Sequence, residues 1–308
     1  MTVTRLYDLA MEYARRTFRD PETRQPTGHH RNWHDGLRHL AELYPQRDPA
    51  TLQAPDFQAL QDHLVDRGTC NITTINNYTR HMRRILKWAS KRVRGYIPKT
   101  VLLEAEEVEY LKPGETAAKE PADRRIATWP QIEAVMTFAS TLYLRQMVEL
   151  HALTGMRSSE LVRMRRSWIR PVPPELFNQA ELTRGMMLYE PRQHKTRKRG
   201  KRRLIVIGPR GAEVLRDHLK RLPADRERVW PITTSNAYYQ AVTRAGKRAE
   251  LDQPITALMI RRYAGYTIRR VDGLDAAQQA LGHAHAKTTE LYAPPDLTKL
   301  IDAMHRHG

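Results

Sequence analysis

The chain has 308 residues, a length that favours about two domains, each large enough to bury a hydrophobic core. Lysine and arginine number 52 against 34 acidic residues, and the net charge of +18 favours a polyanionic partner, first nucleic acid and second an anionic membrane. A single cysteine, Cys70, excludes a disulfide framework or a cysteine-rich zinc site, and no run approaches the roughly 18 apolar residues that span a bilayer.

Residues 1–111 carry the periodicity of amphipathic helices. The chain begins without an apolar signal core, which favours a soluble, intracellular protein. Apolar residues then recur at helical spacing in successive runs, and proline or glycine separates the runs at 21–28, 45–49 and 68. We therefore predict a helical N-terminal domain over residues 1–111.

The fourth of these runs, residues 71–99, contains no acidic residue. It combines one apolar face with one wholly basic face, so a helix here would pack on a core and offer cations to phosphates. An ordinary solvated helix face is the alternative, but such a face usually mixes glutamate with lysine. The candidate DNA contacts on this run are Arg80, Arg83, Arg84, Lys87 and Lys91.

Residues 112–126 are polar and lack apolar periodicity, which makes them the best candidate for a domain linker. A flexible tether here would let two domains close around a duplex from opposite sides. The second domain is then expected to cover residues 127–308.

Early in this second domain, Gly155 is expected to end one helix, and the next helix starts near Arg157. An arginine in a first helical turn lies beside free backbone N–H groups, so a bound anion would meet both. Glu160 lies on the same helical face and could orient Arg157, although a surface arginine–glutamate pair is the common alternative.

Two short β-prone runs, 187–190 and 204–208, flank a very basic segment that contains a glycine. This pattern predicts a β-hairpin with a cationic tip that suits a groove of nucleic acid. A disordered basic loop or a localisation-type patch is the alternative. The candidate DNA contacts at the tip are Arg197, Lys198, Arg199 and Lys201.

Helices are expected again at 209–222 and 234–249, and a third starts at Leu258 and ends near Gly273. The C-terminal tail carries an apolar stripe at helical spacing, formed by Leu297, Leu300, Ile301 and Met304. Such a stripe either folds back on its own core or docks on a neighbouring protomer, and the pattern leaves both possibilities open.

Between the helix that ends near Gly273 and the tail, nine positions separate His283 from Tyr292, and the residues between them include no glycine or proline. A short helix here would hold a phenol at a fixed distance from an imidazole. A tyrosine hydroxyl with a nearby proton acceptor and enough positive charge is a credible nucleophile. A buried tyrosine with a capping histidine is the alternative.

The second domain thus offers arginines, a lysine, a histidine and a tyrosine, but no carboxylate cluster for magnesium and no glycine-rich nucleotide loop. The chemistry that needs this set is attack of a phenol on a phosphodiester, in which arginines neutralise the non-bridging oxygens of the transition state. A lysine can protonate the leaving 5′ oxygen. The histidines elsewhere show no metal-ligand spacing, so we expect neither a metal nor a cofactor.

Several motifs resemble those of the tyrosine recombinase, or phage integrase, family. Residues 154–161 match its Thr-Gly-x-Arg-x-x-Glu-Leu box, and Lys195-Thr196 ahead of Arg203-Leu-Ile-Val matches its Lys-Thr…Arg-x-Val-Pro hairpin. Residues 260–262 match its Leu-Arg-His box, and Leu-Gly-His at 281–283 precedes Tyr292 at the family's spacing. Residues 73–89 are similar to the core-binding helix of integrases.

The resemblance implies a role for each matched residue. Arg157 and Arg261 would be the two catalytic arginines, Lys195 the general acid, His283 the proton-handling histidine and Tyr292 the nucleophile. One position departs from the family pattern, because Leu258 stands where members commonly carry a histidine three residues before the second arginine.

The resemblance also implies a mainly α fold, with a helical, SAM-like core-binding domain and an α+β catalytic domain that carries a small antiparallel sheet. The expected function is a cytoplasmic, nucleoid-associated site-specific DNA recombinase, or integrase, that works through a 3′-phosphotyrosyl intermediate. Its partners would be double-stranded DNA and further copies of the chain, as a tetramer on two DNA sites. The sequence shows no obvious additional DNA-binding segment ahead of the core-binding helices, so we expect a recombinase with one kind of DNA site.

Three alternatives remain open. The first is a type IB topoisomerase-like enzyme, which uses similar chemistry as a monomer. The second is a non-catalytic DNA-binding protein derived from a recombinase, a possibility that Leu258 allows. The third is a general basic nucleic-acid binder, which would not predict an ordered set of motifs.

Overall fold

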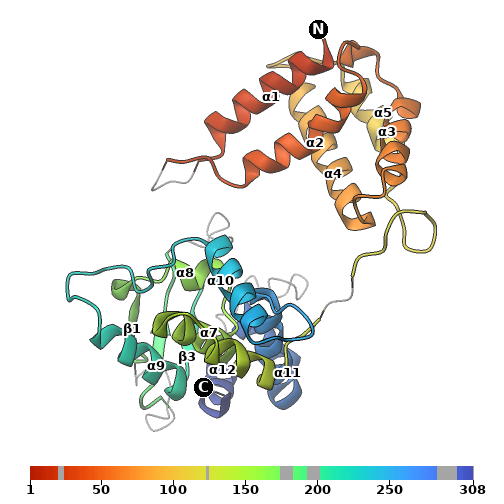
Figure 1. The fold of residues 1–308 in the computed structure, drawn as a ribbon. Helices are drawn as coiled ribbons and strands as arrows, with labels where there is room; N and C mark the ends of the chain where they lie inside the picture. The colour runs from red at the N-terminus through yellow and green to blue at the C-terminus, as the bar shows by residue number, and fades with distance from the viewer. Residues whose placement is uncertain (20–23, 123–124, 174–182, 193–201, 283–296, 308) are drawn as a thin grey trace. The chain divides into compact units, whose positions relative to one another are not determined.

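The computed structural model describes residues 1–19, 24–122, 125–173, 183–192, 202–282 and 297–307. The chain divides into two compact units, Met1–Asp123 and Arg124–Gly308, each built on its own hydrophobic core (Figure 1). None of the helices in the described ranges is long and apolar enough to cross a membrane.

The N-terminal unit is a bundle of α-helices. Polar side chains start several of them: the hydroxyl of Thr2 accepts from the N–H of Arg5, and the side-chain oxygen of Asn71 accepts from the N–H of Thr74. The helices are α1 (Val3–Thr17), α2 (His29–Leu43), α3 (Ala54–Asp66), α4 (Ile72–Ala89) and α5 (Lys99–Glu107), with a short 3₁₀ turn η1 (Pro49–Thr51).

Helix α4 runs through the middle of this bundle and packs against α2 and α5. Its apolar face, which includes Ile75, Ile85 and Leu86, is fully buried. This burial explains why residues 72–89 of the basic run are helical, because a stripe at 3.6-residue spacing is stable only against a partner surface.

The segment that follows α5 lies on the N-terminal unit. Ala118 is buried in its core, and the carbonyl of Lys119 accepts from the N–H of Ile72 at the start of α4. The stretch expected to be a linker therefore contacts the first unit at Ala118 and Lys119, while most of its described side chains are exposed.

The C-terminal unit combines helices with one small sheet. Its strands are β1 (Ile169–Pro171), β2 (Met187–Tyr189) and β3 (Ile205–Ile207), in the order β1-β2-β3 with both pairings antiparallel. Its helices are α6 (Trp129–Thr137), α7 (Leu142–Thr154), α8 (Ser158–Val162), α9 (Pro209–Lys220), α10 (Ser235–Arg248), α11 (Ala257–Leu281) and α12 (Leu297–His307), with a 3₁₀ turn η2 (Arg166–Trp168).

The antiparallel pairing of β2 with β3 confirms the two strands predicted for the hairpin, whereas β1 was not foreseen from the sequence. The basic tip, residues 193–201, lies outside the described residues. Side chains of β2 and β3 alternate between two buried layers: Tyr189 and Ile205 enter the main core, and Leu188 and Val206 enter a second cluster on the opposite face.

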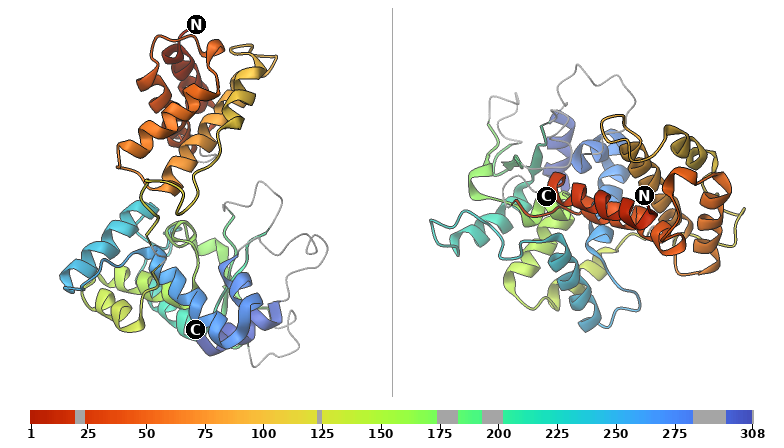
Figure 2. Two further views of the ribbon diagram at one scale, coloured as in Figure 1. Left: turned by 90° about the vertical axis from the view of Figure 1, so that its right-hand side faces the viewer. Right: turned by 90° about the horizontal axis from the view of Figure 1, so that it is seen from above.

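Helix α12 supplies much of that second cluster. Its Leu300, Ile301 and Met304 are buried, and the helix packs against α11 and β3. These three residues of the C-terminal stripe therefore fold back on their own unit, where α12 lies beside α11 (Figure 2). Helix α11 is interrupted at Gly273, which has φ 87° and ψ 178°, and this confirms the predicted helix end near Gly273.

Candidate active site

The turn between α7 and α8 places the first arginine of the site. Gly155 ends α7 in the left-handed conformation with φ +60°, and a Cβ at this position would lie 2.9 Å from Leu281 Cδ2 and 3.0 Å from Ala264 Cβ. Glycine therefore satisfies both the backbone conformation and the close approach of α11. The chain then turns into α8, and Arg157 occupies the position just before its first residue.

Glu160 holds Arg157 through two bonds. One carboxylate oxygen accepts from the backbone N–H of Arg157 at 2.7 Å, and the other accepts from its guanidinium at 2.8 Å. The Glu160 side chain is 1% exposed and that of Arg157 is 25% exposed. Glu160 thus orients Arg157 as the spacing predicted, and leaves the guanidinium partly open to solvent.

Arg261 reaches the same place from the first turns of α11. Its guanidinium donates to the carbonyl of Gly155 at 2.6 Å and to the carbonyl of Leu281 at 2.8 Å. Burial, followed by the charge of Arg157, lowers the pKa of Arg261 to about 10, so the group remains charged at neutral pH. The structure therefore brings together Arg157 and Arg261 from separate helices.

A third arginine, Arg203, completes the cluster although it was not among the candidate site residues. It lies two residues before β3 and continues the alternation that sends Ile205 into the main core. Its guanidinium donates to the carbonyls of Gln279 at 3.0 Å and Ala280 at 2.7 Å, and its Nε lies 3.5 Å from a Glu160 oxygen. Burial lowers its pKa, against the raising effect of Glu160.

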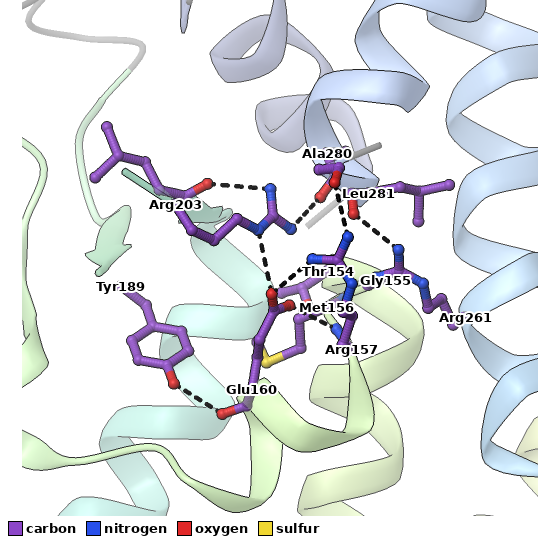
Figure 3. A network of polar contacts seen from close by, with 12 residues as sticks. Thr154, Gly155, Met156, Arg157, Glu160, Tyr189, Arg203, Arg261, Ala280 and Leu281 are labelled. Carbon is purple, nitrogen blue, oxygen red and sulfur yellow. Dashed lines mark hydrogen bonds and ion pairs between the residues drawn. The ribbon is translucent and has the colours of Figure 1, made fainter. Parts of the chain in front are cut away.

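The last turn of α11 is the surface that these arginines share (Figure 3). The final carbonyls of a helix have no partner within it and carry its partial negative charge. Here Arg203 donates to the carbonyls of Gln279 and Ala280, and Arg261 donates to that of Leu281. Arg157 donates to the carbonyl of Gly282 at 2.7 Å. Gly282 has φ +60°, and a Cβ on it would lie 2.6 Å from the Arg203 guanidinium.

Positive charge exceeds negative charge in this cluster, since its described members are three guanidinium groups and one carboxylate. Burial by itself would raise the pKa of Glu160, but Arg203 and the hydrogen bonds from Arg157 outweigh it and hold that pKa below its ordinary value. One ionised glutamate does not neutralise three arginines, so the cluster keeps a net positive charge that can bind an additional anion.

Two buried tyrosines make hydrogen bonds next to the arginine cluster. The hydroxyl of Tyr189 donates to the backbone carbonyl of Glu160 at 2.7 Å. The hydroxyl of Tyr238 lies 3.1 Å from Nδ1 of His151, one turn before Gly155 on α7. Burial, and then the charge of Arg261, lowers the pKa of His151 to about 3, so this imidazole is neutral at physiological pH.

Several predicted site residues lie outside the described part of the chain: Lys195, His283, Tyr292, Arg197, Lys198, Arg199 and Lys201. His283 directly follows Gly282, whose carbonyl is held by Arg157. Leu258, which replaces a histidine of the family pattern, is 53% exposed on the first turn of α11.

The basic face of α4 divides into two kinds of side chain. Arg80, Arg84 and Lys87 are exposed on α4 at spacings of four and three residues, and Lys91 is exposed just beyond the end of the helix. Arg83 points elsewhere, since its guanidinium donates to the carbonyls of Ala105 and Val108 and lies 4.7 Å from the ring centroid of Tyr110. Arg83 therefore holds the end of α5 in place.

From the sequence, Arg203 was matched to the family's hairpin motif but given no role in the site, and Tyr189 and His151 were not predicted as site residues. For Arg203 a signal existed, because it keeps the two-residue alternation of Ile205 and Ile207, but it was hidden at the end of a run of cations. Within the described ranges, no group of three or more histidine, cysteine, aspartate or glutamate residues is placed to hold a metal ion.

A family model described as "Phage integrase family" matches residues 127–298, which is more than half of the chain. No curated protein sequence matches.

Among solved structures, a lambda integrase dimer bound to a COC′ core site has a TM-score of 0.63 at 17% identity, over 92% of this chain and 96% of that one. The Tn1549 transposon integrase in complex with transposon right end DNA has a TM-score of 0.63 at 14% identity, over 99% of both chains. The XerH site-specific recombinase bound to difH has a TM-score of 0.58 at 14% identity, over 98% and 93%. At these identities the likeness supports the mainly helical fold with its small antiparallel sheet.

Proposed function

The chain belongs to the phage integrase family, and on that premise we propose that it is a site-specific recombinase that cleaves and rejoins DNA through a phosphotyrosyl intermediate. The observation that carries this proposal is the convergence of Arg157 and Arg261 beside the end of α11, in a cluster with excess positive charge. Such an arrangement suits a phosphodiester, whose charge grows as a nucleophile attacks.

The proposed reaction begins with attack of the Tyr292 oxygen on the scissile phosphorus. His283 takes the phenolic proton, the bond to the 5′ oxygen breaks, and Lys195 protonates that oxygen as it leaves. Arg157 and Arg261 neutralise the non-bridging oxygens. A 5′ hydroxyl of a partner duplex then attacks the phosphotyrosine and restores a phosphodiester, so the step as written needs neither metal nor nucleotide.

We assign DNA binding to the exposed Arg80, Arg84 and Lys87 of α4, to Lys91 just beyond it, and to the basic hairpin tip. A solved lambda integrase structure is described as a tetramer bound to a Holliday junction, and we propose the same stoichiometry for this chain. A cytoplasmic, nucleoid-associated location follows from a DNA substrate.

Leu258 favours a second candidate function, a DNA-binding protein that has lost strand cleavage. Leu258 is exposed on the first turn of α11. Because a leucine can neither donate a hydrogen bond to a phosphate nor transfer a proton, the role of the family's histidine is unfilled at this position. This candidate predicts DNA binding without a covalent product.

The deciding experiment is a covalent-trapping assay on a nicked duplex that carries the DNA flanking the chain's own coding sequence, with chelator present. We expect a denaturation-resistant protein–DNA band with the wild type, none with Tyr292→Phe, and a loss of at least about 100-fold with Arg157→Ala. DNA binding with no covalent band on any duplex from a randomised pool would support the non-catalytic candidate. Relaxation of plasmids without a specific site would instead indicate a topoisomerase-like enzyme.

A further inference from the structure

We propose that Arg203 is a positioning residue of the active site: it fixes the end of α11 and Glu160, and through them sets the places of Arg157 and Arg261. The inference rests on the proposed recombinase function, because that function assigns those two arginines to the scissile phosphate. It gives a role in strand cleavage to a residue that is not itself placed to touch DNA.

Arg203 is more deeply buried than Arg157. Its side chain is 7% exposed, against 25% for Arg157, and Arg261 is as buried as Arg203, at 8%. Both of its terminal nitrogens donate to carbonyls of α11, and its Nε lies beside Glu160 (Figure 3). The donors of this guanidinium are therefore directed into the protein.

The contacts of Arg203 lie next to those of the other two arginines. Arg203 donates to the carbonyls of Gln279 and Ala280. The next two carbonyls along the chain, those of Leu281 and Gly282, accept from Arg261 and Arg157 respectively. Because these four carbonyls follow one another at the end of α11, three in its last turn and one on the capping Gly282, an anchor on the first two sets the position of the second two. A shift of this turn would displace both phosphate-binding guanidiniums together.

Glu160 provides a second connection. One of its oxygens lies 2.8 Å from the Arg157 guanidinium and 3.5 Å from Nε of Arg203. Without Arg203, the whole charge of this buried carboxylate would act on Arg157 and reduce its attraction for a phosphate. Arg203 thus affects both the geometry and the available charge of its neighbour.

The shape of the guanidinium matters here as much as its charge. A planar fork can donate to two successive carbonyls while its Nε faces a carboxylate, whereas a lysine ammonium is a single point charge on a flexible stem. Gly282 supports this fit, since any Cβ at that position would lie 2.6 Å from the fork.

The first test measures hydrogen–deuterium exchange of the full chain without DNA, and so does not depend on activity. We expect Arg203→Ala to accelerate exchange of amides in peptides covering 274–282 by at least about tenfold, because charge-assisted bonds to the helix end are lost. Arg202→Ala is the matched control, because its side chain is 71% exposed and pairs with Glu190. Equal exchange in wild type and Arg203→Ala would overturn the inference.

The second test compares cleavage of a normal scissile phosphate with cleavage of a neutral methylphosphonate at the same position. An arginine that neutralises phosphate charge becomes dispensable on the neutral substrate, so Arg157→Ala should recover most of its lost rate there. Arg203→Ala should remain at least about tenfold slow on both substrates at saturating DNA, while Arg203→Lys recovers only in part.

Recovery of Arg203→Ala on the methylphosphonate would make Arg203 a phosphate ligand and overturn the positioning role. Addition of millimolar guanidinium ion to Arg203→Ala should restore part of its rate, whereas sodium at the same ionic strength should not. If the wild type itself forms no covalent product, the proposed function fails, and the exchange experiment still decides whether Arg203 anchors the end of α11.

Discussion

Replacing Glu160 with glutamine tests whether the buried carboxylate holds the arginine cluster together. The substitution keeps the size of the side chain and removes its charge. In the structure Glu160 accepts two hydrogen bonds from Arg157, at 2.7 and 2.8 Å, and lies 3.5 Å from Arg203. Hydrogen bonds to charged groups contribute about 1.5–3 kcal/mol each, and removal of one member of a buried ion pair costs about 3–5 kcal/mol.

We therefore expect Glu160→Gln to lower the free energy of unfolding of the C-terminal unit by about 3–4 kcal/mol, since the amide oxygen keeps part of one bond. Glu190→Gln is the control, because Glu190 pairs with the exposed Arg202 and should cost less than about 1 kcal/mol. Urea unfolding followed by pulsed hydrogen exchange would report the two units separately. A loss below about 1 kcal/mol for Glu160→Gln would refute the reasoning.

The pH dependence of that difference provides a second check. The pKa of Glu160 in the folded protein lies below its ordinary value of 4.5, so its ionised form stabilises the fold above pH 4.5. This stabilisation is lost as the pH falls through the folded pKa. The gap between wild type and Glu160→Gln should accordingly be constant near neutrality and narrow below pH 4.5, and a gap that widens in acid would contradict the assignment.

Three further predictions follow from single residues. Gly282→Ala should destabilise the C-terminal unit by more than about 3 kcal/mol in urea unfolding, because it adds a clash with a buried guanidinium to a left-handed backbone, whereas Gly185→Ala, with φ +81° and its nearest atom at 3.6 Å, should cost only about 1–2 kcal/mol. Burial lowers the pKa of His151 from its ordinary 6.5 to about 3, so below pH 6.5 the unfolded chain binds a proton at this residue and the folded chain does not. His151→Leu should therefore remove up to about 1.4 kcal/mol per pH unit of acid destabilisation, and an unchanged slope of unfolding free energy against pH between pH 6 and 4 would argue against a neutral buried imidazole. Arg84→Ala should reduce by about one the slope of log affinity for DNA against log salt with little effect on thermal stability, whereas Arg83→Ala should lower the melting temperature of the N-terminal unit and leave the salt slope unchanged.

Local features of the fold could be predicted from the sequence because they depend on near neighbours in the chain. The break at Gly155, the bonds between Glu160 and Arg157, and the end of a helix at Gly273 each follow from backbone preference or from helical spacing. The pairing of β2 with β3 followed from two β-prone runs on either side of a turn.

Charge patterns proved less informative about individual side chains. Arg83 and Arg84 are adjacent and equally basic, yet one holds the end of α5 and the other is exposed to solvent. Arg203 ends a run of cations that looks uniformly exposed, and it is buried. A sequence records that a residue is charged, but which face of an element meets a partner depends on the packing of other elements.

The sequence by itself determined the family, the helical periodicity, the basic run of α4 and the motifs around Arg157 and Arg261. Only the tertiary structure decided that α12 folds back on β3 and α11, and that Arg157, Arg203 and Arg261 meet at one helix end. The physical reason is that the unpaired carbonyls of a helix terminus attract cations from any part of the chain, and only the packing of α7, α8 and β3 around α11 selects which cations reach them.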